Sequence, residues 1–518
     1  MSRKRSIAAA AAALAIATGA LTACSADPST SDGKSVLRVG VNSGEATLNP
    51  AINLVGRLQD LSNESLIHET DDGTFEPLLA SEFGYVGTGN TDFRLKLRDN
   101  VQFSDGTPLN AAAVKGWLQY YHDANGPLAN GLDIKSIDTP DDLTVVIHLN
   151  APNPIVPWVL SDIAGGYGLV SAPAGVANPT LLSTQTFGVG PYVIDPSRTV
   201  SGAEDGATYV FLRNDKYYDQ SRIHFDEIDF TVYTQPSTML AAVQSGQLDL
   251  AQGDISTNDA AQSAGLNVVG ADTGWIGFLM MDRGPFLPDG STVNPLHDVR
   301  VRQALNYAVD RDAIISGIIK TSGTATSQAP TTDGVDPAYD NYYPYDLAKA
   351  KQLLADAGYP NGFTLKVTSQ SYIGTLGDPV LQAFADDLSD VGVKLEINTT
   401  SSVTDFVDKI FSGDWVATGF LQQPYVPMYQ FYGYYTGKDK ILSQNGSDDP
   451  ELDTLYEQAL TAADPGPIWR QMSDRNVEQA FIVPLFRFKS YWYLQNGIGG
   501  VHFSSSTAYP DPREWTRG

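Results

Sequence analysis

Alternation of hydrophobic and polar residues is clearest over positions 93–97 of this chain. Phe93, Leu95 and Leu97 are separated by basic residues, which is the period-two pattern of a strand with one buried face. The segment Asp105-Gly106-Thr107-Pro108 predicts a turn after this strand, because Gly tolerates positive φ and Pro fixes its own φ. Asn110 then suits the N-cap of a helix, whose hydrophobic residues recur at helical spacing: Ala113, Val114, Trp117 and Tyr121.

Helical and strand patterns alternate over residues 346–420. Asp346 opens the first helix, and Gly358 ends it. Such alternation favours a mostly parallel sheet with helices on both sides, as in α/β folds. We expect helices over 346–358, 379–388 and 403–411, and strands over 363–367, 393–397 and 415–420.

Other segments predict further elements outside residues 346–420. Ser237, Asp298 and Asp310 each precede a helical pattern at a place that suits an N-cap, and residues 447–450 read as the N-terminus of a later helix. Apolar segments predict strands over 36–41, 143–149, 228–233 and 275–281, and a helix-like segment over 155–163.

The first 23 residues form a segment that we expect to be removed. It has a basic start at positions 3–5 and an alanine-rich apolar run over 7–20 that is too short for a stable membrane span. The run ends in Leu21-Thr22-Ala23-Cys24, which resembles a bacterial lipobox. We therefore predict a lipoprotein signal peptide over 1–23 and a lipid on Cys24. An ordinary cleaved signal with an incidental cysteine is the alternative.

Composition excludes several classes of function. Cys24 is the only cysteine in 518 residues, so the chain has no disulfide framework and no thiolate metal site. The formal net charge is −27, which is unsuited to binding nucleic acid or anionic lipid headgroups. Residues 24–35 are polar and rich in Ser, Asp and Gly, which predicts a flexible tether before the fold.

No catalytic or cofactor-binding constellation is recognisable. The sequence has neither a G-x-S-x-G nucleophile elbow nor an H-E-x-x-H motif, and its six His include no pair at metal-ligand spacing. The glycines of Phe187-Gly188-Val189-Gly190-Pro191-Tyr192 are not followed by the Lys-Ser/Thr of a phosphate loop. We expect a protein that is not an enzyme and holds no cofactor or metal.

Several motifs together resemble one protein family. They are LKLRDNVQFSDGTPL ahead of the first predicted helix, FGVGPY at 187–192, SGQLD at 245–249 and PLHDVRVRQALNYAVDR at 295–311. The chain is similar here to the family 5 extracellular solute-binding proteins, which are dipeptide-, oligopeptide- and nickel-binding lipoproteins of ABC importers. The resemblance extends from about Val36 to Glu514.

The resemblance implies a fold and a set of partners. We expect an α/β, two-lobed periplasmic-binding-protein-like (type II) fold with a hinge and a cleft, plus an extra β-rich domain. The implied partners are a small-molecule solute, the transmembrane subunits of an ABC permease, and the membrane through the lipid anchor, with a monomeric chain on the extracytoplasmic face. The expected divisions are lobe I over 36–68, 187–271 and 490–518, the extra domain over 69–186, and lobe II over 272–489.

The resemblance also places the ligand pocket. Glu45 lies in a loop that borders the cleft in the family, although a solvated loop carboxylate is the alternative. Gln423 falls where peptide-binding members place an Asp for the ligand ammonium. Tyr and Trp rings suit stacking on sugars or flat organic molecules, and an aromatic cluster follows Gln423. The predicted ligand-binding residues are Glu45, Trp275, Phe420, Gln423, Tyr425 and Tyr429.

Charge at these positions narrows the expected ligand. A neutral Gln423 cannot form the charge-assisted hydrogen bond of an Asp. No basic residue occurs between Lys366 and Lys394, where dipeptide-binding members use an Arg for the ligand carboxylate. We therefore predict a ligand without a free zwitterionic backbone: a sugar, a modified or longer peptide, or another polar organic molecule.

Two other classes of function stay open. One is a degenerate binding-protein lipoprotein with a regulatory or envelope-assembly role. The other is a secreted hydrolase, which would need a compact Ser/His/Asp or metal cluster in the cleft.

Overall fold

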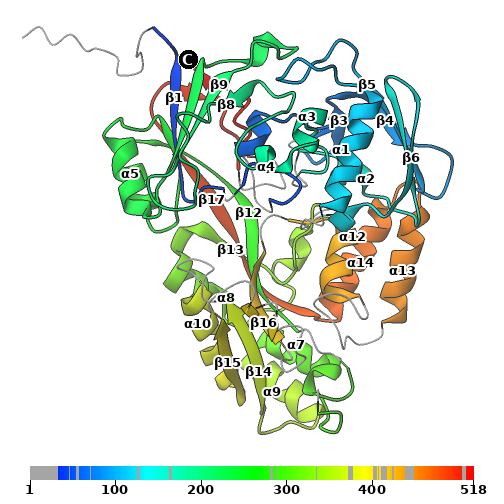
Figure 1. Cartoon of the computed structure of the whole chain (residues 1–518). Helices are drawn as coiled ribbons and strands as arrows, with labels where there is room; N and C mark the ends of the chain where they lie inside the picture. The colour runs from blue at the N-terminus through cyan, green and yellow to red at the C-terminus, as the bar shows by residue number, and fades with distance from the viewer. Residues whose placement is uncertain are drawn as a thin grey trace, which may run out of the picture.

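The computed structural model describes residues 33–45, 47–53, 58–70, 72–124, 129–162, 166–280, 284–287, 289–333, 335–370, 377–400, 405–406, 408–409, 417–422, 425–437, 449–503 and 509–518. These residues form an upper part and a lower part, and two long strands, β12 (Asn267–Leu279) and β17 (Ile482–Leu494), run through both (Figure 1). Among the helices of this described portion, none combines the length and the apolar character that crossing a membrane requires.

One 11-stranded sheet extends through both parts, in the order β15-β14-β16-β12-β17-β11-β1-β10-β9-β8, with β13 on β17. β12 and β17 pair antiparallel from Asn267↔Leu494 to Leu279↔Ile482. Because each strand has 13 residues, its two ends have different neighbours. β17 pairs with β11 over 492–494 and with β13 over 486–488, and β12 pairs with β16 over 275–279. The two parts therefore share one sheet.

Lobe I is the upper end of this sheet with its helices. β1 pairs in parallel with β10 and β11, and its Leu37 and Val39 are completely buried, as the apolar pattern predicts. The predicted N-cap at Ser237 is wrong, because Gln235 is the N-cap and Pro236 occupies the first turn, which its fixed φ suits. The elements are β1 (Val36–Val41), β8 (Tyr192–Ile194), β9 (Thr208–Arg213), β10 (Glu227–Val232), β11 (Leu250–Gln252), α5 (Pro236–Gln244) and α6 (Asn258–Ser263).

Lobe II is the lower end of the sheet. β14 pairs in parallel with both β15 and β16, so the predicted parallel arrangement is confirmed here. The predicted N-caps Asp298, Asp310 and Asp346 are also confirmed, since each side chain accepts a backbone N–H of the first turn. The helix predicted over 403–411 lies largely outside the described residues. The elements are β13 (Gly323–Ala325), β14 (Phe363–Gln370), β15 (Val393–Thr400), β16 (Ala417–Gln422), α7 (Val299–Tyr307), α8 (Arg311–Ile314), α9 (Leu347–Asp356) and α10 (Gly377–Ser389).

The extra domain lies beside lobe I in the upper part (Figure 1). It contains an antiparallel sheet in the order β4-β5-β7-β6 and a small β2–β3 pair. The helix predicted over 155–163 is only α2, which spans Val156–Val159. The elements are β2 (Ile67–Glu69), β3 (Phe75–Pro77), β4 (Ala80–Tyr85), β5 (Asp92–Leu97), β6 (Ile134–Asp141), β7 (Thr144–Leu149), α1 (Ala111–Asp123), α2, α3 (Pro173–Val176) and α4 (Pro179–Leu182).

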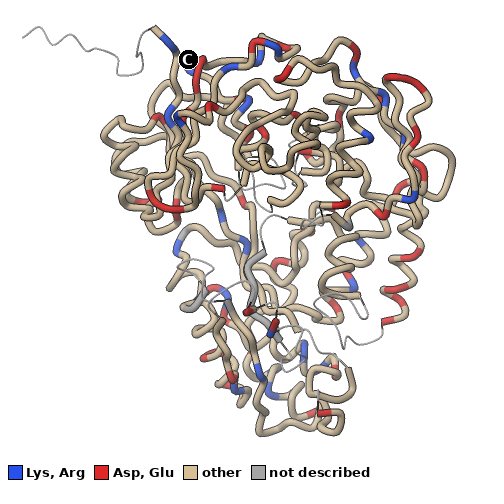
Figure 2. Tube along the Cα trace, viewed as in Figure 1, with Lys and Arg blue, Asp and Glu red and all other residues tan. Residues whose placement is uncertain are grey.

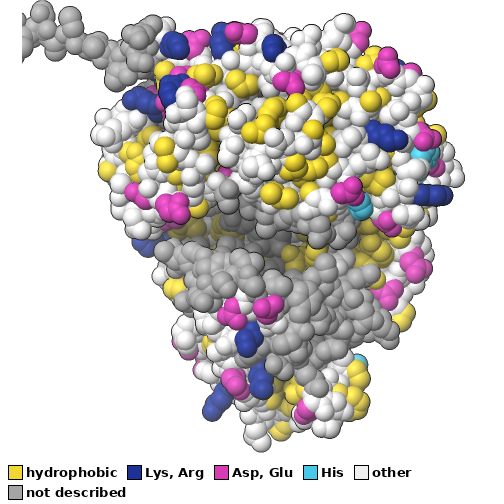
Figure 3. Space-filling model, in the orientation of Figure 1, with side chains coloured by type: hydrophobic (Ala, Val, Ile, Leu, Met, Phe, Trp, Pro, Cys, Tyr) yellow, Lys and Arg dark blue, Asp and Glu magenta, His cyan; other side chains and the backbone are white. Residues whose placement is uncertain are grey.

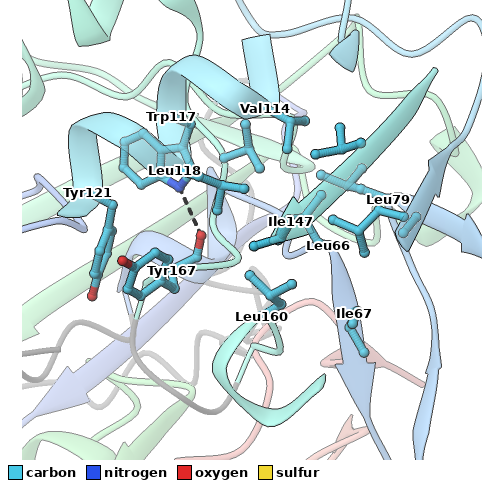
Figure 4. Close-up of a cluster of buried hydrophobic side chains, with 14 of the residues drawn as sticks. Leu66, Ile67, Leu79, Val114, Trp117, Leu118, Tyr121, Ile147, Leu160 and Tyr167 are labelled. Carbon is cyan, nitrogen blue, oxygen red and sulfur yellow. Dashed lines mark hydrogen bonds between the residues drawn. The ribbon is translucent and has the colours of Figure 1, made fainter. Parts of the chain in front are cut away.

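Helix α1 packs its apolar face into the core of this domain. Asn110 accepts a hydrogen bond from the Ala113 N–H at 2.9 Å, which confirms the predicted N-cap. The Trp117 indole is fully buried and donates to the Tyr167 carbonyl at 3.0 Å (Figure 4). The rings of Tyr121 and Tyr167 lie 4.1 Å apart. The helical spacing in the sequence therefore produces the buried face that it predicts.

Three further helices, α12 (Met428–Phe431), α13 (Pro450–Thr461) and α14 (Gly466–Glu478), lie below the extra domain on the side of lobe II (Figure 1). Asp449 N-caps α13, which confirms the predicted helix start. The Asn90 side chain, in the turn between β4 and β5, donates to the carbonyls of Leu460 and Ala462 at 2.8 and 3.2 Å. The extra domain and lobe II are thus in contact away from β12 and β17.

Two of the lobe boundaries predicted from the sequence fall on the long strands. The divisions at 271/272 and 489/490 lie opposite each other, since Ala271 pairs with Ser490 and Asp272 pairs with Lys489. The boundaries themselves stay a prediction.

A buried ionic network fastens the C-terminal segment to the extra domain. This segment begins with β18 (Ile498–Gly499) and ends with β19 (Thr516–Arg517), which pair antiparallel. Arg513 is 3% exposed and binds Asp511 at 2.6 Å and Asp162 at 2.8 Å. His68 also contacts Asp162, at 2.8 Å. Burial alone would raise the pKa of Asp162, but the hydrogen bond from His68 and the charge of Arg513 hold it below its usual range.

We predict that Arg513→Met lowers the free energy of unfolding by about 3–5 kcal/mol, because it removes the cation that pairs with the buried Asp162 and the partly buried Asp511. Arg94→Met is the control: its ion pair with Glu82 has side chains 48% and 67% exposed, so its loss should cost under about 1 kcal/mol. Urea denaturation followed by circular dichroism measures both. Equal effects of the two substitutions would show that the Arg513 network does not stabilise the fold.

Candidate functional site

The molecular surface is hollowed between the upper and lower parts (Figure 3). β12 and β17 cross from one part to the other at this level (Figure 1). The predicted site residues of lobe II belong to this crossing, to β16 beside it or to the segment that follows β16. Acidic and basic positions are spread over both parts (Figure 2), so the local arrangement of charge has to be followed residue by residue.

Trp275 lies at the centre of the crossing. On β12 it pairs with Arg487 of β17 on one side and with Gln422 of β16 on the other. Its indole is completely buried, and a Cβ added at Gly277 would approach Trp275 Cζ3 to 2.4 Å. Gly277 therefore leaves the room that the indole occupies. Trp275 is a core residue in this structure, and its contact with a solute stays a prediction.

Tyr425 and Tyr429 pack in the same hydrophobic cluster as Trp275. Tyr425 is 6% exposed, and its hydroxyl has no hydrogen-bond partner among the described residues. The ring of Tyr429 lies 5.6 Å from that of Tyr456 and also packs against the core of the extra domain. The structure thus brings three of the predicted residues together.

The other predicted residues are placed less fully. Phe420 lies on β16, where its backbone pairs with Gly277, and its side chain is not among those described. Gln423 and Cys24 lie outside the described residues. Glu45 is described, but it belongs to lobe I and packs apart from the Trp275 cluster.

Charged residues share one face of the crossing with Trp275. Asp272 pairs with Lys489, and Trp275 pairs with Arg487. Cross-strand partners lie on the same face of a sheet, as do residues two apart on one strand. A β-bulge between Asp272 and Gly274 turns positions 272 and 275 to the same side, as bulges near functional sites often do.

Asp340 completes this group of charges. Its carboxylate forms an ion pair with Arg487 Nη2 at 2.9 Å. Burial raises the pKa of Tyr425 most; the carboxylate of Asp272 raises it further, Arg487 opposes this, and Asp340 adds to it. The phenol is therefore within electrostatic reach of all three charged groups.

Glu45 is buried rather than solvated, with 7% exposure. Its carboxyl accepts hydrogen bonds from the Leu58 N–H at 2.9 Å, the Asn53 amide at 3.0 Å and the Gln59 amide at 3.2 Å. Burial raises the pKa of Glu45 to about 8, although the Leu58 N–H opposes this and Asp60 adds to it. This carboxyl therefore fixes Asn53, Leu58 and Gln59 against the loop after β1.

Glu45 also borders a small pocket at the carboxyl end of β1, the end where α/β lobes place ligand contacts. The rings of Trp492 and Trp515 lie 5.3 Å apart in its wall, and their indole N–H groups have no acceptor among the described residues. The remaining lining residues are Val41, Ser43, Gly44, Leu58, Phe230, Tyr509, Pro510 and Pro512.

The described residues include no group of three or more His, Cys, Asp or Glu that could hold a metal ion. The side chains gathered at the crossing are a phenol, an indole and charged groups of both signs. Such a set can hold a polar organic molecule by hydrogen bonds and by contact with rings.

The chain belongs to the bacterial extracellular solute-binding proteins, family 5, since residues 74–441 match the model described as "family 5 Middle" of these proteins. The predicted family is thus confirmed. Members of this family bind solutes for transport and are not enzymes.

Among curated proteins, the chain is similar to glutathione-binding proteins named GsiB. The protein from Pectobacterium atrosepticum is 30% identical over 332 residues, which cover 62% of this chain and 60% of that protein. The protein from Salmonella typhimurium is 30% identical over 329 residues, covering 61% and 59%. The matched region thus spans about three fifths of these relatives.

Solved structures confirm the two-lobed fold. NikA from Brucella suis in complex with Fe(III)-EDTA has a TM-score of 0.76 at 20% identity, covering 93% of this chain and 100% of that one. AgaA of A. tumefaciens R10 in complex with agropinic acid has a TM-score of 0.73 at 24% identity, covering 93% and 99%. At these identities the likeness shows the fold alone.

Sequence reasoning missed the charged residues of the crossing. Arg487 and Lys489 are the two charged positions of β17, an otherwise largely apolar strand of 13 residues. Two basic residues at alternate positions of an apolar strand were the signal that could have been used. They indicate that acidic partners lie nearby in the fold, because a buried charge needs a partner. The sequence held no comparable signal for Trp492 and Trp515, because their rings come together only where the C-terminal segment returns to lobe I.

We predict that Glu45→Gln changes the pH dependence of stability. In the native chain, a folded pKa of about 8 lies above the unfolded value, so stability from this group is fully present below about pH 4.5 and is lost as the pH rises towards 8. Glu45→Gln removes this loss, so its unfolding free energy relative to the native chain should rise by roughly 3 kcal/mol between pH 5 and 8. Urea unfolding at several pH values measures the difference, and parallel pH profiles would contradict it.

Proposed function

We propose that this chain is a lipid-anchored solute-binding protein of an ABC importer, which captures a polar organic solute between its lobes and presents it to a membrane permease. The observation that carries this proposal is the β12–β17 crossing, where one antiparallel pair joins two lobes and a polar cluster lies at the junction. Family membership supports it.

The crossing suits a hinge. Two lobes that share one strand pair can rotate when a few residues of that pair change their backbone angles. β12 has irregular register at 272/274 and at 276/277, on either side of Trp275. Opening must also release Asn90 from the carbonyls of Leu460 and Ala462, so a bound solute that contacts both lobes would favour the closed arrangement.

The relatives support a polar organic solute. The GsiB proteins are named for glutathione binding. The structural neighbours include a complex with agropinic acid and a putative peptide-binding protein, AppA, from Clostridium difficile. These names favour a peptide or another polar organic molecule as the solute. The polar and aromatic residues at the crossing favour the same class.

The mature protein should change its melting temperature when its solute is present, because a ligand that binds only the folded form stabilises it by mass action. Thermal-shift measurements against dipeptides, oligopeptides, glutathione, oligosaccharides and chelated nickel test this. We expect at least one compound to raise the melting temperature in a saturable way. A flat response across the panel would contradict solute capture and favour a regulatory or envelope-assembly role.

The lipid anchor is part of the proposal. It is supported by Cys24 at the end of the apolar N-terminal run, and it places a monomeric chain on the outer face of the cell membrane. We predict that Cys24→Ser releases the folded protein into the medium, whereas the parent protein stays with the membrane fraction. Cell fractionation and immunoblotting measure this, with Ser25→Ala as the control. A membrane-bound Cys24→Ser protein would show that the apolar run anchors the chain without lipid.

A further inference from the structure

The turn between β4 and β5 carries a side chain that links the extra domain to lobe II. The Asn90 amide donates to the carbonyl of Leu460 at 2.8 Å and to that of Ala462 at 3.2 Å. A side-chain amide has two N–H donors, so both can be used on lobe II. The two partners lie 370 positions apart in the sequence from Asn90 to Leu460. The contact therefore exists only where the folded chain brings the two parts together.

The acceptors of this contact lie at the C-terminal end of α13, which lies below the extra domain (Figure 1). The last four carbonyls of an α-helix have no partner within the helix, and they carry the negative end of the helix dipole. α13 ends at Thr461, so Leu460 belongs to its last turn, and Ala462 is the C-cap. A residue of the extra domain thus supplies donors to a helix end of lobe II that lacks them.

The turn holds Asn90 in a fixed orientation. Its φ is 54°, in the left-handed region that Asn adopts more readily than most other residues. The Val86 N–H donates to the Asp92 carbonyl at 2.9 Å and closes the turn, and the Asn90 carbonyl accepts from the Asn153 N–H at 3.0 Å. The backbone that presents the amide is therefore fastened within the extra domain.

A ring of lobe II makes the reciprocal contact. Tyr429, on α12, packs against the buried core of the extra domain and against the hydrophobic cluster of Trp275. Its ring lies 5.6 Å from the ring of Tyr456 on α13. The extra domain thus contacts both α12 and α13. We call Asn90 and Tyr429 the latch residues.

The chemistry of the latch residues suits a contact that opens and closes. The hydrogen bonds of Asn90 are partly buried and join neutral groups. Such bonds exchange with water at a small net cost, whereas the buried charges around Arg513 cannot be separated so easily. The irregular register of β12 near Trp275 allows rotation between the lobes. The latch residues lie away from that pair of strands and can resist the rotation.

We propose that the extra domain is a latch, which holds lobe II in the arrangement of this structure when no solute is bound. This gives the extra domain a role that solute capture alone does not assign to it. When only a fraction of the molecules has the arrangement that binds, the apparent Kd rises by the inverse of that fraction. The latch residues thereby set the solute affinity through the balance of arrangements.

Distances between the extra domain and α13 test the latch without a solute. Cys24 is the only cysteine, so a mature chain with Cys24→Ser accepts nitroxide labels at two introduced cysteines. Thr139→Cys on β6 and Gln458→Cys on α13 suit the labels, because both positions are exposed. The protein is unfolded and refolded to remove bound solute. Pulsed electron double resonance should then give a major population at the separation that these positions have in this structure.

Asn90→Gly removes the amide and keeps the backbone, because Gly adopts positive φ without strain. We expect the ratio of this population to longer distances to fall roughly tenfold, through the loss of two hydrogen bonds. Asn90→Asp keeps the size but turns a carboxylate towards two carbonyls, so the ratio should fall further. Asn100→Gly is the matched control, since Asn100 also has a positive φ, of 58°, and is exposed. It should leave the ratio unchanged.

Tyr429→Ala removes the reciprocal contact and should add to the effect of Asn90→Gly, with circular dichroism to check that each variant is folded. If the parent shows only distances longer than that of the structure, the latch is not engaged without solute and the inference is overturned. The same distance distribution in the parent and in both Asn90 variants also overturns it. Neither result touches solute capture, because the thermal-shift panel tests that separately.

Discussion

The antiparallel pairing of β12 with β17 is the interaction on which the rest of the structure depends. Each strand continues from lobe I into lobe II. This one strand pair therefore connects the upper strands of the sheet to the lower ones and forms the junction between them. Any rotation between lobes must be absorbed within this pair. The bulge after Asp272 and the absence of a Cβ at Gly277 mark where its regular geometry is relaxed, and the Trp275 indole fills the space that Gly277 leaves.

Buried charge in this protein is held by ion pairs between distant parts of the chain. Around Arg513, each carboxylate faces a cation or a backbone N–H, and the network ties the C-terminal segment to the extra domain. At the crossing, Arg487 pairs with Asp340 at 2.9 Å. Both arginines keep one nitrogen without a partner among the described residues, Arg513 Nη1 and Arg487 Nε. A low-dielectric interior strengthens paired groups and penalises unpaired ones.

Local patterns predicted much of the fold correctly. The strand over 93–97, the Asn110 cap and helix α1 follow from spacing and side-chain hydrogen bonding within a few residues. The same is true of Asp298, Asp310 and Asp346, whose short carboxylates reach the first-turn N–H groups of their own helices. Ser237 failed because Pro236 already begins the helix. The apolar run over 155–163 forms only the short helix α2. Its side chains are apolar because they are buried in the core of the extra domain, and burial of apolar side chains does not by itself favour a helix.

By itself, the sequence predicted many of the elements and the family, and it proposed Trp275, Tyr425 and Tyr429 as separate candidates that the structure packs into one cluster. It could not show that Trp275 is a buried core ring, that Glu45 is held by three hydrogen-bond donors, or that Asp340 pairs with Arg487. The physical reason is the separation along the chain of the residues that interact. Caps, turns and strand alternation are decided by neighbours in the chain, whereas the ion pair of Arg487 with Asp340 joins residues 147 positions apart. Only the tertiary structure decides which charges become neighbours.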